Sequence, residues 1–249
     1  PFGGAARINW LIQRERARAD RLLHLDSGDS FQGAPIFNFF GGEAEVRALA
    51  ATGVDGVLIG NHEFDRGALN LYRQFNAWAT FPVLAANYQW DDPTTPGSAE
   101  LGRIARPYHI YNVRGLKVGV IGFGNLSSIT SIFDQPNRPG ITAINPVEVA
   151  QHYIDILQAQ NVDLVVGLSH LGLEADDHMI ERTSGFDVVL GGHLHIVLNP
   201  SQQVRDCQPF NELGEHFIPI LADPQQRSAT CTPSADVCCD ASGVCPPEP

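Results

Sequence analysis

Apolar residues along the first 190 positions occur in short blocks that alternate between helical and strand-like spacing. In residues 4–21 they recur every three or four positions among several arginines, which is typical of an amphipathic helix. The apolar run Leu22–Leu25 predicts a short strand, because the turn-rich segment Asp26–Ser30 follows it directly. The chain therefore opens with a helix, a strand and a polar loop.

The same alternation continues as far as residue 190. Further helices are predicted over residues 43–51, 68–79, 146–159 and 174–183. Further strands are predicted over residues 56–60, 82–86, 108–113, 116–122, 162–168 and 186–190. The turn Arg114-Gly115 predicts a hairpin between two of these strands. Strands rich in Val, Ile and Leu, separated by helices, indicate a layered α/β domain whose sheet is covered on both faces.

Two segments interrupt this pattern, and a third ends it. Residues 91–98 and 134–140 are rich in Asp, Pro and Gly, so we expect exposed loops there. From Asp223 onward the apolar periodicity disappears. We therefore expect a globular domain over residues 1–222 and an irregular tail over residues 223–249. The opening at Pro1 has no initiator Met and no signal-peptide pattern, which predicts a processed start or a fragment.

All five cysteines lie in the last 43 residues. They are Cys207, Cys231, Cys238, Cys239 and Cys245. A Cys-rich segment too short for a core of its own favours disulfides and an oxidising compartment. A zinc site is the competing interpretation, but the segment has no Cys-x2-Cys pair. We therefore expect a periplasmic, cell-surface or secreted protein, with the disulfide connectivity and the odd cysteine left open.

Composition and charge exclude several other classes of protein. The 249 residues are 43% hydrophobic and 18% charged, as expected for one or two globular domains. Sixteen basic and 28 acidic side chains give a net charge of −12, which repels a phosphate backbone and argues against nucleic-acid binding. No stretch approaches 18 consecutive apolar residues, so we expect no membrane span in this chain.

Residues of types that commonly bind metals follow four of the predicted strands. They are Asp29, Asn61, His170 and His193. In sheet proteins of this kind, the functional site lies at the carboxyl ends of the strands. Each residue taken alone has an ordinary explanation as a turn former, a cap or a hydrogen-bonded histidine. Four of them at equivalent positions favour a shared metal site instead.

Four sequence blocks carry a resemblance to a known family. They are Gly28-Asp29, Gly60-Asn61-His62-Glu63, His170 and Gly192-His193-Leu194-His195. With them, the chain resembles the calcineurin-like metallophosphoesterase superfamily over about residues 3–200. The longer runs 25–33, 60–67 and 168–172 resemble its 5′-nucleotidase branch. The resemblance implies a four-layer α/β/β/α fold that holds two divalent metal ions.

The resemblance also implies a role for each ligand. Asp29 would bridge both metals, Asn61, His170 and His193 would complete one site, and His195 would serve the other metal. Imidazole, carboxylate and amide ligands without a thiolate suit Zn²⁺, Mn²⁺, Fe or Co²⁺ better than Ca²⁺. Two ions about 3.5–4 Å apart can polarise a phosphoryl group and hold a hydroxide for in-line attack.

Two further roles and one departure follow from the same resemblance. His62 would stabilise the transition state or protonate the leaving group, and Asp65 would orient its ring. The family carries another Asp-x-His pair upstream of the position of Pro1, so the second metal site is incomplete in this chain. The run Asp176–His178 has a similar spacing, but a surface helix explains it better.

The leading hypothesis is a metal-dependent hydrolase of phosphate esters, a 5′-nucleotidase-like phosphomonoesterase whose expected substrate is a small anionic ester of the nucleotide class. A nucleotide-sugar or cyclic-nucleotide phosphodiesterase is the alternative within the same class. A non-catalytic metal-binding module is the alternative from another class, if the upstream Asp-x-His is absent from the whole protein. The sequence of the full-length gene upstream of Pro1 would separate the last alternative from the first two.

Overall fold

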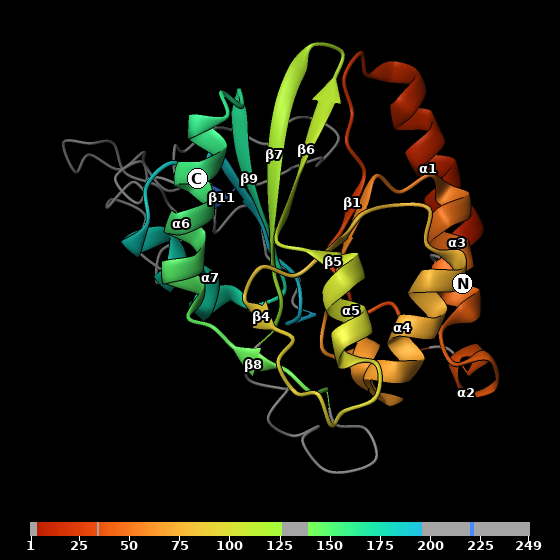
Figure 1. Ribbon diagram of the computed structural model, residues 1–249. Coiled ribbons are helices and arrows are strands. Elements are labelled where there is room, and N and C mark those ends of the chain that lie inside the picture. The colour runs from red at the N-terminus through yellow and green to blue at the C-terminus, as the bar shows by residue number, and fades with distance from the viewer. Residues whose placement is uncertain (1–3, 34, 126–138, 196–219, 222–249) are drawn as a thin grey trace, which may run out of the picture.

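The computed structural model describes residues 4–33, 35–125, 139–195 and 220–221, with the backbone alone at the last two. Its helices are α1 (Ala5–Arg18), α2 (Ile36–Phe40), α3 (Glu43–Thr52), the 3-10 helix η1 (His62–Phe64), α4 (Gly67–Trp78), α5 (Ser98–Ile104), α6 (Pro146–Ala159) and α7 (Leu173–Arg182). Its strands are β1 (Leu25–Asp26), β2 (Gly56–Leu58), β3 (Val83–Leu84), β4 (Tyr88–Gln89), β5 (Ala105–Arg106), β6 (Tyr108–Val113), β7 (Leu116–Phe123), β8 (Thr142–Ala143), β9 (Leu164–Ser169), β10 (Val188–Leu190) and β11 (Ile220–Leu221). The strands lie between helices α1 to α5 on one side and helices α6 and α7 on the other (Figure 1).

The strands form two principal sheets and one small one. The first sheet has the order β1-β2-β3-β5, and all of its pairs are parallel. The second has the order β11-β10-β9-β7-β6, in which β7, β9 and β10 are parallel and the two outer strands are antiparallel to their neighbours. Strands β4 and β8 form the third. Val113 pairs with Leu116 across Arg114-Gly115, so the predicted hairpin is confirmed.

Side chains alternate between the two faces of the strands and so build separate apolar clusters. Val57 of β2 and Ile59, which directly follows β2, pack in one cluster with residues of α3 and α4. Leu58, between them, packs in another cluster with Val120 and Leu168 of the second sheet. This alternation follows from the period of two residues in a strand. The cluster around Leu58 therefore lies between the two sheets.

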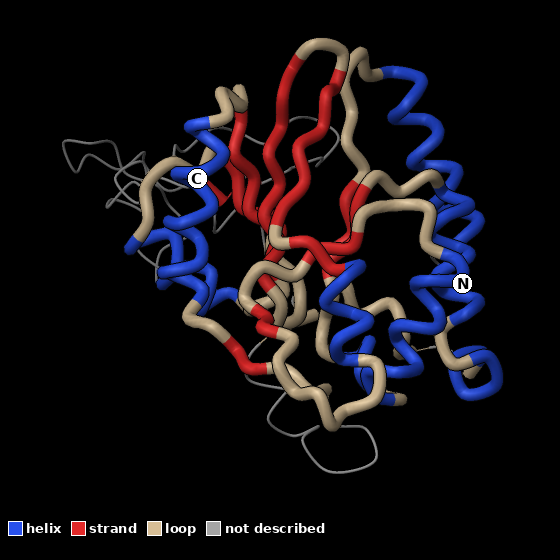
Figure 2. Tube along the Cα trace, in the orientation of Figure 1, coloured by secondary structure: helices blue, strands red, loops and turns tan. Residues whose placement is uncertain are grey.

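The second sheet also has a helical cover. Phe123 and Val165 pack in a third cluster with Ile154 of α6 and Met179 of α7. Figure 2 shows the same arrangement, with strands in the middle and helices on either side. Parallel strands that are buried on both faces have the apolar composition seen in the sequence. The predicted α/β fold is therefore confirmed, and the structure adds that most strands of both principal sheets pair in parallel.

The structure differs from the prediction in several places. The first strand is Leu25–Asp26, later than the sequence pattern predicts. The pattern also does not predict helices α2 and α5, the 3-10 helix η1, or strands β4, β5, β8 and β11. The prediction of an exposed loop over residues 91–98 is wrong at Thr95 and Ser98, which are buried. Their burial is tolerated because each hydroxyl is satisfied by donating a hydrogen bond, to Asp92 and to the carbonyl of Gly140 respectively. The predicted tail, all five cysteines and residues 134–138 lie outside the described residues.

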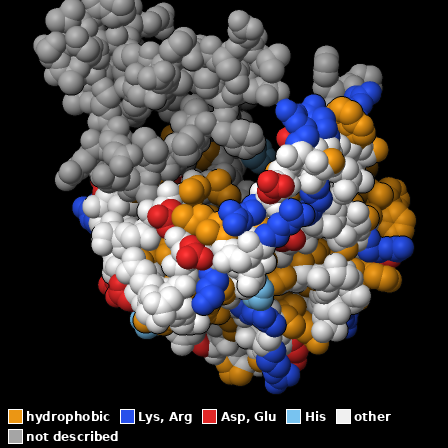
Figure 3. Space-filling view, turned by 90° about the horizontal axis from the view of Figure 1, so that it is seen from above, with side chains coloured by type: hydrophobic (Ala, Val, Ile, Leu, Met, Phe, Trp, Pro, Cys, Tyr) orange, Lys and Arg blue, Asp and Glu red, His pale blue; other side chains and the backbone are white. Residues whose placement is uncertain are grey.

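Helix α1 lies at the surface. None of its residues is buried, and Arg16 attaches it to the domain by donating to the carbonyl of Gly53 and to the carboxylate of Asp55. The view from above in Figure 3 shows apolar, basic and acidic side chains interspersed on the described part of this face. Among the described residues, no helix combines the length and apolar character that crossing a membrane requires.

Candidate metal centre

The four predicted ligand loops come together where the two sheets meet. Each loop follows the carboxyl end of a strand, namely β1, β2, β9 or β10. His170, after β9, contacts the loop after β1, because its Nδ1 lies 2.6 Å from the carbonyl oxygen of Ser27. Gly192, after β10, lies against the same loop. It has no side chain, and a Cβ atom added at this position would lie only 2.6 Å from Ser27 Oγ. The two sheets therefore contribute to one site.

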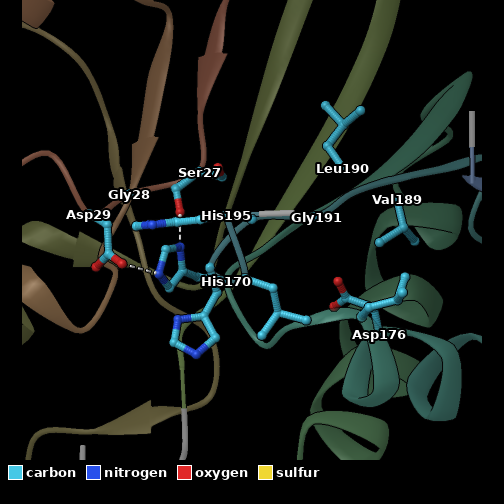
Figure 4. Close-up of a pocket in the computed structure, with 13 residues that line it drawn as sticks. Ser27, Gly28, Asp29, His170, Asp176, Val189, Leu190, Gly191 and His195 are labelled. Carbon is cyan, nitrogen blue, oxygen red and sulfur yellow. Dashed lines mark hydrogen bonds and ion pairs between the residues drawn. The ribbon is translucent and has the colours of Figure 1, made fainter. Parts of the chain in front are cut away.

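Asp29, His170 and His193 form the centre of this site. Their ligand atoms all lie within 4.8 Å of one another, as expected for side chains that share one cation. His170 Nε2 is 2.7 Å from Asp29 Oδ2. Figure 4 shows the His170 ring between Asp29 and Ser27, with a dashed line to each. The structure therefore brings together three of the predicted ligands.

Unsatisfied polar atoms indicate what this arrangement can hold. In the described part of the chain, two buried side-chain atoms of predicted ligands, Asn61 Oδ1 and His193 Nδ1, have no hydrogen-bond partner. A third buried atom, His170 Nε2, faces the Asp29 carboxylate at 2.7 Å, and Asp29 is itself a predicted ligand. Such atoms are costly to bury without a partner, and a divalent cation would satisfy them. With the Asp29 carboxylate, the donor set fits a transition metal that accepts nitrogen and oxygen ligands.

The orientation of His170 agrees with this assignment. Its Nδ1–H can donate to the Ser27 carbonyl, which in the neutral ring leaves the lone pair of Nε2 directed toward Asp29. Metal-binding histidines in proteins are commonly held in this way by a second hydrogen bond. The Ser27 carbonyl therefore fixes the tautomer that a metal requires.

The charged groups of the centre change one another's pKa values. Burial alone would raise the pKa of Asp29, but the interaction with His170 and the hydrogen bond from the His62 backbone outweigh burial and lower that pKa. Burial opposes the charged form of His170, yet the Asp29 carboxylate raises the His170 pKa above its usual value. Burial, followed by repulsion from His170, lowers the pKa of His193. Asp29 and His170 thus favour each other's charged forms, whereas burial and the nearby His170 disfavour the charged form of His193.

His195 lies in the same pocket but outside the group of three. It is exposed, it has a φ of +49°, and it lines the pocket together with Asp29 and His193. The residues that follow it lie outside the described part of the chain. Its assignment to a second metal stays a prediction.

His62 and Asp65 are adjacent, as predicted. His62 Nδ1 lies 3.1 Å from Asp65 Oδ2, and Gln32 Nε2 donates to the same oxygen. An acidic partner at Nδ1 favours the tautomer in which Nε2 is available to accept a proton or contact another group. The backbone N–H of His62 donates to Asp29 Oδ1 at 2.8 Å, which places this pair directly beside the centre. The catalytic roles of the two side chains stay predictions.

Glu63 is part of the site, although no pattern in the sequence assigns it a role. It is fully buried, and its carboxylate accepts four hydrogen bonds from the two loops that carry Asp29 and Asn61. Burial raises the pKa of Glu63, while its backbone donors act in the opposite direction. The sequence does contain a signal for the burial of Glu63. The residue directly follows His62, and this segment lies at the end of a strand that the apolar pattern predicts to be buried.

The prediction that Asp176 lies on a surface helix is wrong for that residue. Its side chain is buried in α7, where it accepts a hydrogen bond from Ser169 Oγ, and burial raises its pKa to about 6. Asp176 also lines the pocket beside Gly191 (Figure 4). The helical spacing contained the signal, because Asp176 falls three and four residues before the apolar Met179 and Ile180.

Comparison with known proteins gives a consistent picture. A 5′-nucleotidase of Diplobatis ommata is 35% identical over 225 residues, which are 90% of this chain and 37% of that protein. A snake venom 5′-nucleotidase of Crotalus adamanteus is 34% identical over 197 residues, covering 79% of this chain and 32% of that protein. The chain thus spans about a third of the length of these curated relatives.

The fold of this chain is similar to that of a solved 5′-nucleotidase structure. The crystal structure of a 5′-nucleotidase precursor from Thermus thermophilus has a TM-score of 0.69 and 33% sequence identity, over 82% of this chain and 37% of that one. The calcineurin-like phosphoesterase family matches residues 2–197, a range that includes every predicted ligand and both predicted catalytic residues. This chain therefore belongs to the calcineurin-like phosphoesterase family.

Proposed function

We propose that the chain is the metal-binding part of a 5′-nucleotidase-like phosphomonoesterase, a hydrolase that releases phosphate from nucleotides. The observation that carries this proposal is the convergence of Asp29, His170 and His193 in one pocket, with their ligand atoms within 4.8 Å of one another. The buried and unpartnered Asn61 Oδ1 adds a fourth ligand of suitable chemistry. Similarity to 5′-nucleotidases of 34–35% identity supports the nucleotide class of substrate.

Each of these residues has a defined part in the proposed reaction. Bound divalent ions, of which Zn, Mn, Fe or Co suit the ligands, would supply Lewis-acid activation of the phosphoryl group. Asp29, Asn61, His170 and His193 would hold one ion, and Asp29 with His195 would hold the second. His62, with its ring protonated, would donate a hydrogen bond or a proton from Nε2 to the reacting phosphate ester, and Asp65 would keep its ring in the required orientation.

The proposal includes the domain organisation and the location of the protein. We assign residues 1–222 to a four-layer α/β/β/α catalytic domain, an assignment supported by the apolar cluster between the two sheets and by the helices packed on their outer faces. We assign residues 223–249 to a tail or linker with disulfide bonds. The tail composition and the similarity to a snake venom enzyme support a location outside the cytoplasm.

A substrate panel tests the function. The full-length protein should be depleted of metal, reloaded with Mn²⁺ or Zn²⁺, and assayed for phosphate release from AMP, with a cyclic nucleotide and a nucleotide sugar as the alternative substrates. We expect AMP to be hydrolysed with the highest kcat/KM and chelation to abolish the activity. Preferred cleavage of either alternative substrate would overturn the monoesterase proposal, and metal-independent hydrolysis would overturn the role of the centre.

Metal content provides a second test. By the family resemblance, the second ion needs an Asp-x-His pair upstream of the position of Pro1. Metal analysis should find two ions per molecule if that pair is present in the full-length chain. In the 249-residue chain alone, one ion should bind more tightly than a second. Two equally tight ions in the short chain would contradict the ligand assignment.

A further inference from the structure

The loop that carries Asp29 has a backbone conformation that other residues must maintain. Asp29 has a φ of +64°, in the left-handed region that residues other than glycine adopt at an energetic cost. Gly28, before it, also has a positive φ, of +89°. Because the backbone of Asp29 determines where its carboxylate lies, the groups that hold this backbone also determine the geometry of the metal centre.

Glu63 makes the contacts that hold it. Its Oε2 accepts the backbone N–H groups of Asp29, at 2.9 Å, and Gly60, at 2.7 Å. Its Oε1 accepts the backbone N–H of Ser30, at 2.7 Å, and the Ser30 hydroxyl, at 3.1 Å. The two successive N–H groups of Asp29 and Ser30 therefore both point at one carboxylate. This arrangement depends on the present conformation of Asp29.

The loop after β2 closes the arrangement from the other side. The N–H of His62 donates to Asp29 Oδ1 at 2.8 Å, so the two loops are joined by hydrogen bonds in both directions. Gly60 lies so close that a Cβ atom there would be 2.5 Å from Asp29 Oδ1 and 2.9 Å from Glu63 Oε2. The space between the loops is therefore filled by the Glu63 carboxylate and the backbone that it contacts.

We propose that Glu63 is a positioning residue of the metal centre: it fixes the left-handed backbone of Asp29 and thereby holds the Asp29 carboxylate within reach of the ion shared with His170 and His193. Glu63 itself does not bind the ion. This inference rests on the proposed metal centre but is independent of the proposed substrate.

The substitution Glu63→Gln tests the proposal with almost no change of shape. Each carboxylate oxygen of Glu63 faces two hydrogen-bond donors. A glutamine amide has one oxygen and one NH₂ group. In one orientation its NH₂ group faces the backbone N–H groups of Asp29 and Gly60, in the other it faces the backbone N–H of Ser30, and it can accept from none of them. Asp187→Asn is the matched control, because Asp187 Oδ2 accepts the Val165 N–H away from the centre and an amide oxygen can replace it.

Two measurements on the full-length protein, made free of metal, decide the question. Calorimetric titration with Mn²⁺ should give at least about tenfold weaker binding to Glu63→Gln, as found when outer contacts of metal ligands are removed. Hydrogen exchange should become faster at the amides of residues 29, 30 and 60 and stay unchanged in β9. Asp187→Asn should match the wild type in both measurements.

Each result supports or overturns the inference. Wild-type affinity in Glu63→Gln overturns it, and so does an equal loss of affinity in both variants, because that would indicate general destabilisation. If Glu63→Gln does not fold, hydrogen exchange in the wild-type metal-free protein decides the question. Protected amides at Asp29 and Ser30 support the inference that Glu63 holds this backbone, and rapid exchange at these amides overturns it. A wild type that binds no Mn²⁺ refutes the proposed metal centre, whereas the exchange data still decide whether Glu63 holds the loop.

Discussion

Replacing Asp176 by Asn should remove a pH dependence from the stability of the metal-free protein. Burial raises the pKa of Asp176 from 3.8 to about 6. An acid with a higher pKa in the folded protein than in the unfolded chain binds its proton more tightly when folded. Its stabilising contribution is therefore fully present below about pH 4 and is lost as the pH rises through about 6.

The size of this contribution to stability follows from the difference in the pKa of Asp176 between the folded and the unfolded chain. Each unit of pKa difference corresponds to about 1.4 kcal/mol, so the shift of Asp176 amounts to roughly 3 kcal/mol between pH 4 and pH 8. Asn cannot ionise, and its amide oxygen can still accept the hydrogen bond from Ser169 Oγ. The variant should consequently lose the pH-dependent part of the free energy while keeping the local contact.

Urea unfolding followed by circular dichroism at several values between pH 4 and pH 8 measures the difference directly. The free energy of unfolding of Asp176→Asn, minus that of the wild type, should increase by roughly 3 kcal/mol over this range. Titrating groups that do not interact with Asp176 cancel in the subtraction, and Asp177 and His170 contribute only the change in their interaction with it. A difference that stays constant with pH would refute the argument, because it would mean that Asp176 is ionised in the folded protein throughout.

Four further outcomes are expected. His62→Ala should lower the turnover of AMP by about 100-fold or more while metal content, measured by elemental analysis, stays that of the wild type. His193→Ala should instead lose metal in the same analysis. Gly60→Ala should weaken Mn²⁺ binding and lower stability by about 1–3 kcal/mol in urea unfolding, because its Cβ would press against Asp29. Thiol titration of protein from its native compartment should find fewer than five free thiols; five would refute the disulfides.

The positions of the ligand loops could be predicted because they depend on local patterns. A short apolar run followed by Gly28-Asp29 or by Gly60-Asn61 identifies a strand end from neighbouring residues alone. Parallel pairing then brings such ends to the same edge of a sheet. The structure confirms this for the loops after β1, β2, β9 and β10.

The remaining features depend on contacts between distant parts of the chain. Glu63 is buried because two loops close around it, and Asp176 is buried because α7 packs on the second sheet and Ser169 provides a donor. An acidic residue is normally expected at the surface. Local spacing places Glu63 at a strand end and Asp176 on the apolar side of its helix, but it does not show which groups cover and satisfy their carboxylates. Strands of two residues, such as β1, have no periodicity of their own, and their limits depend on the strands beside them.

The division of the site between two sheets has a consequence for how the protein folds. The first sheet uses strands from residues 25–106 and the second uses strands from residues 108–221. The contact between Ser27 and His170 spans 143 residues of chain. Contacts of such long separation form slowly, because the intervening chain must first be ordered. During synthesis Asp29 leaves the ribosome long before His193, so a nascent chain has half of the proposed metal site until both sheets exist and have docked. Metal capture should therefore report the completion of folding, and incompletely synthesised chains should not compete for the ion.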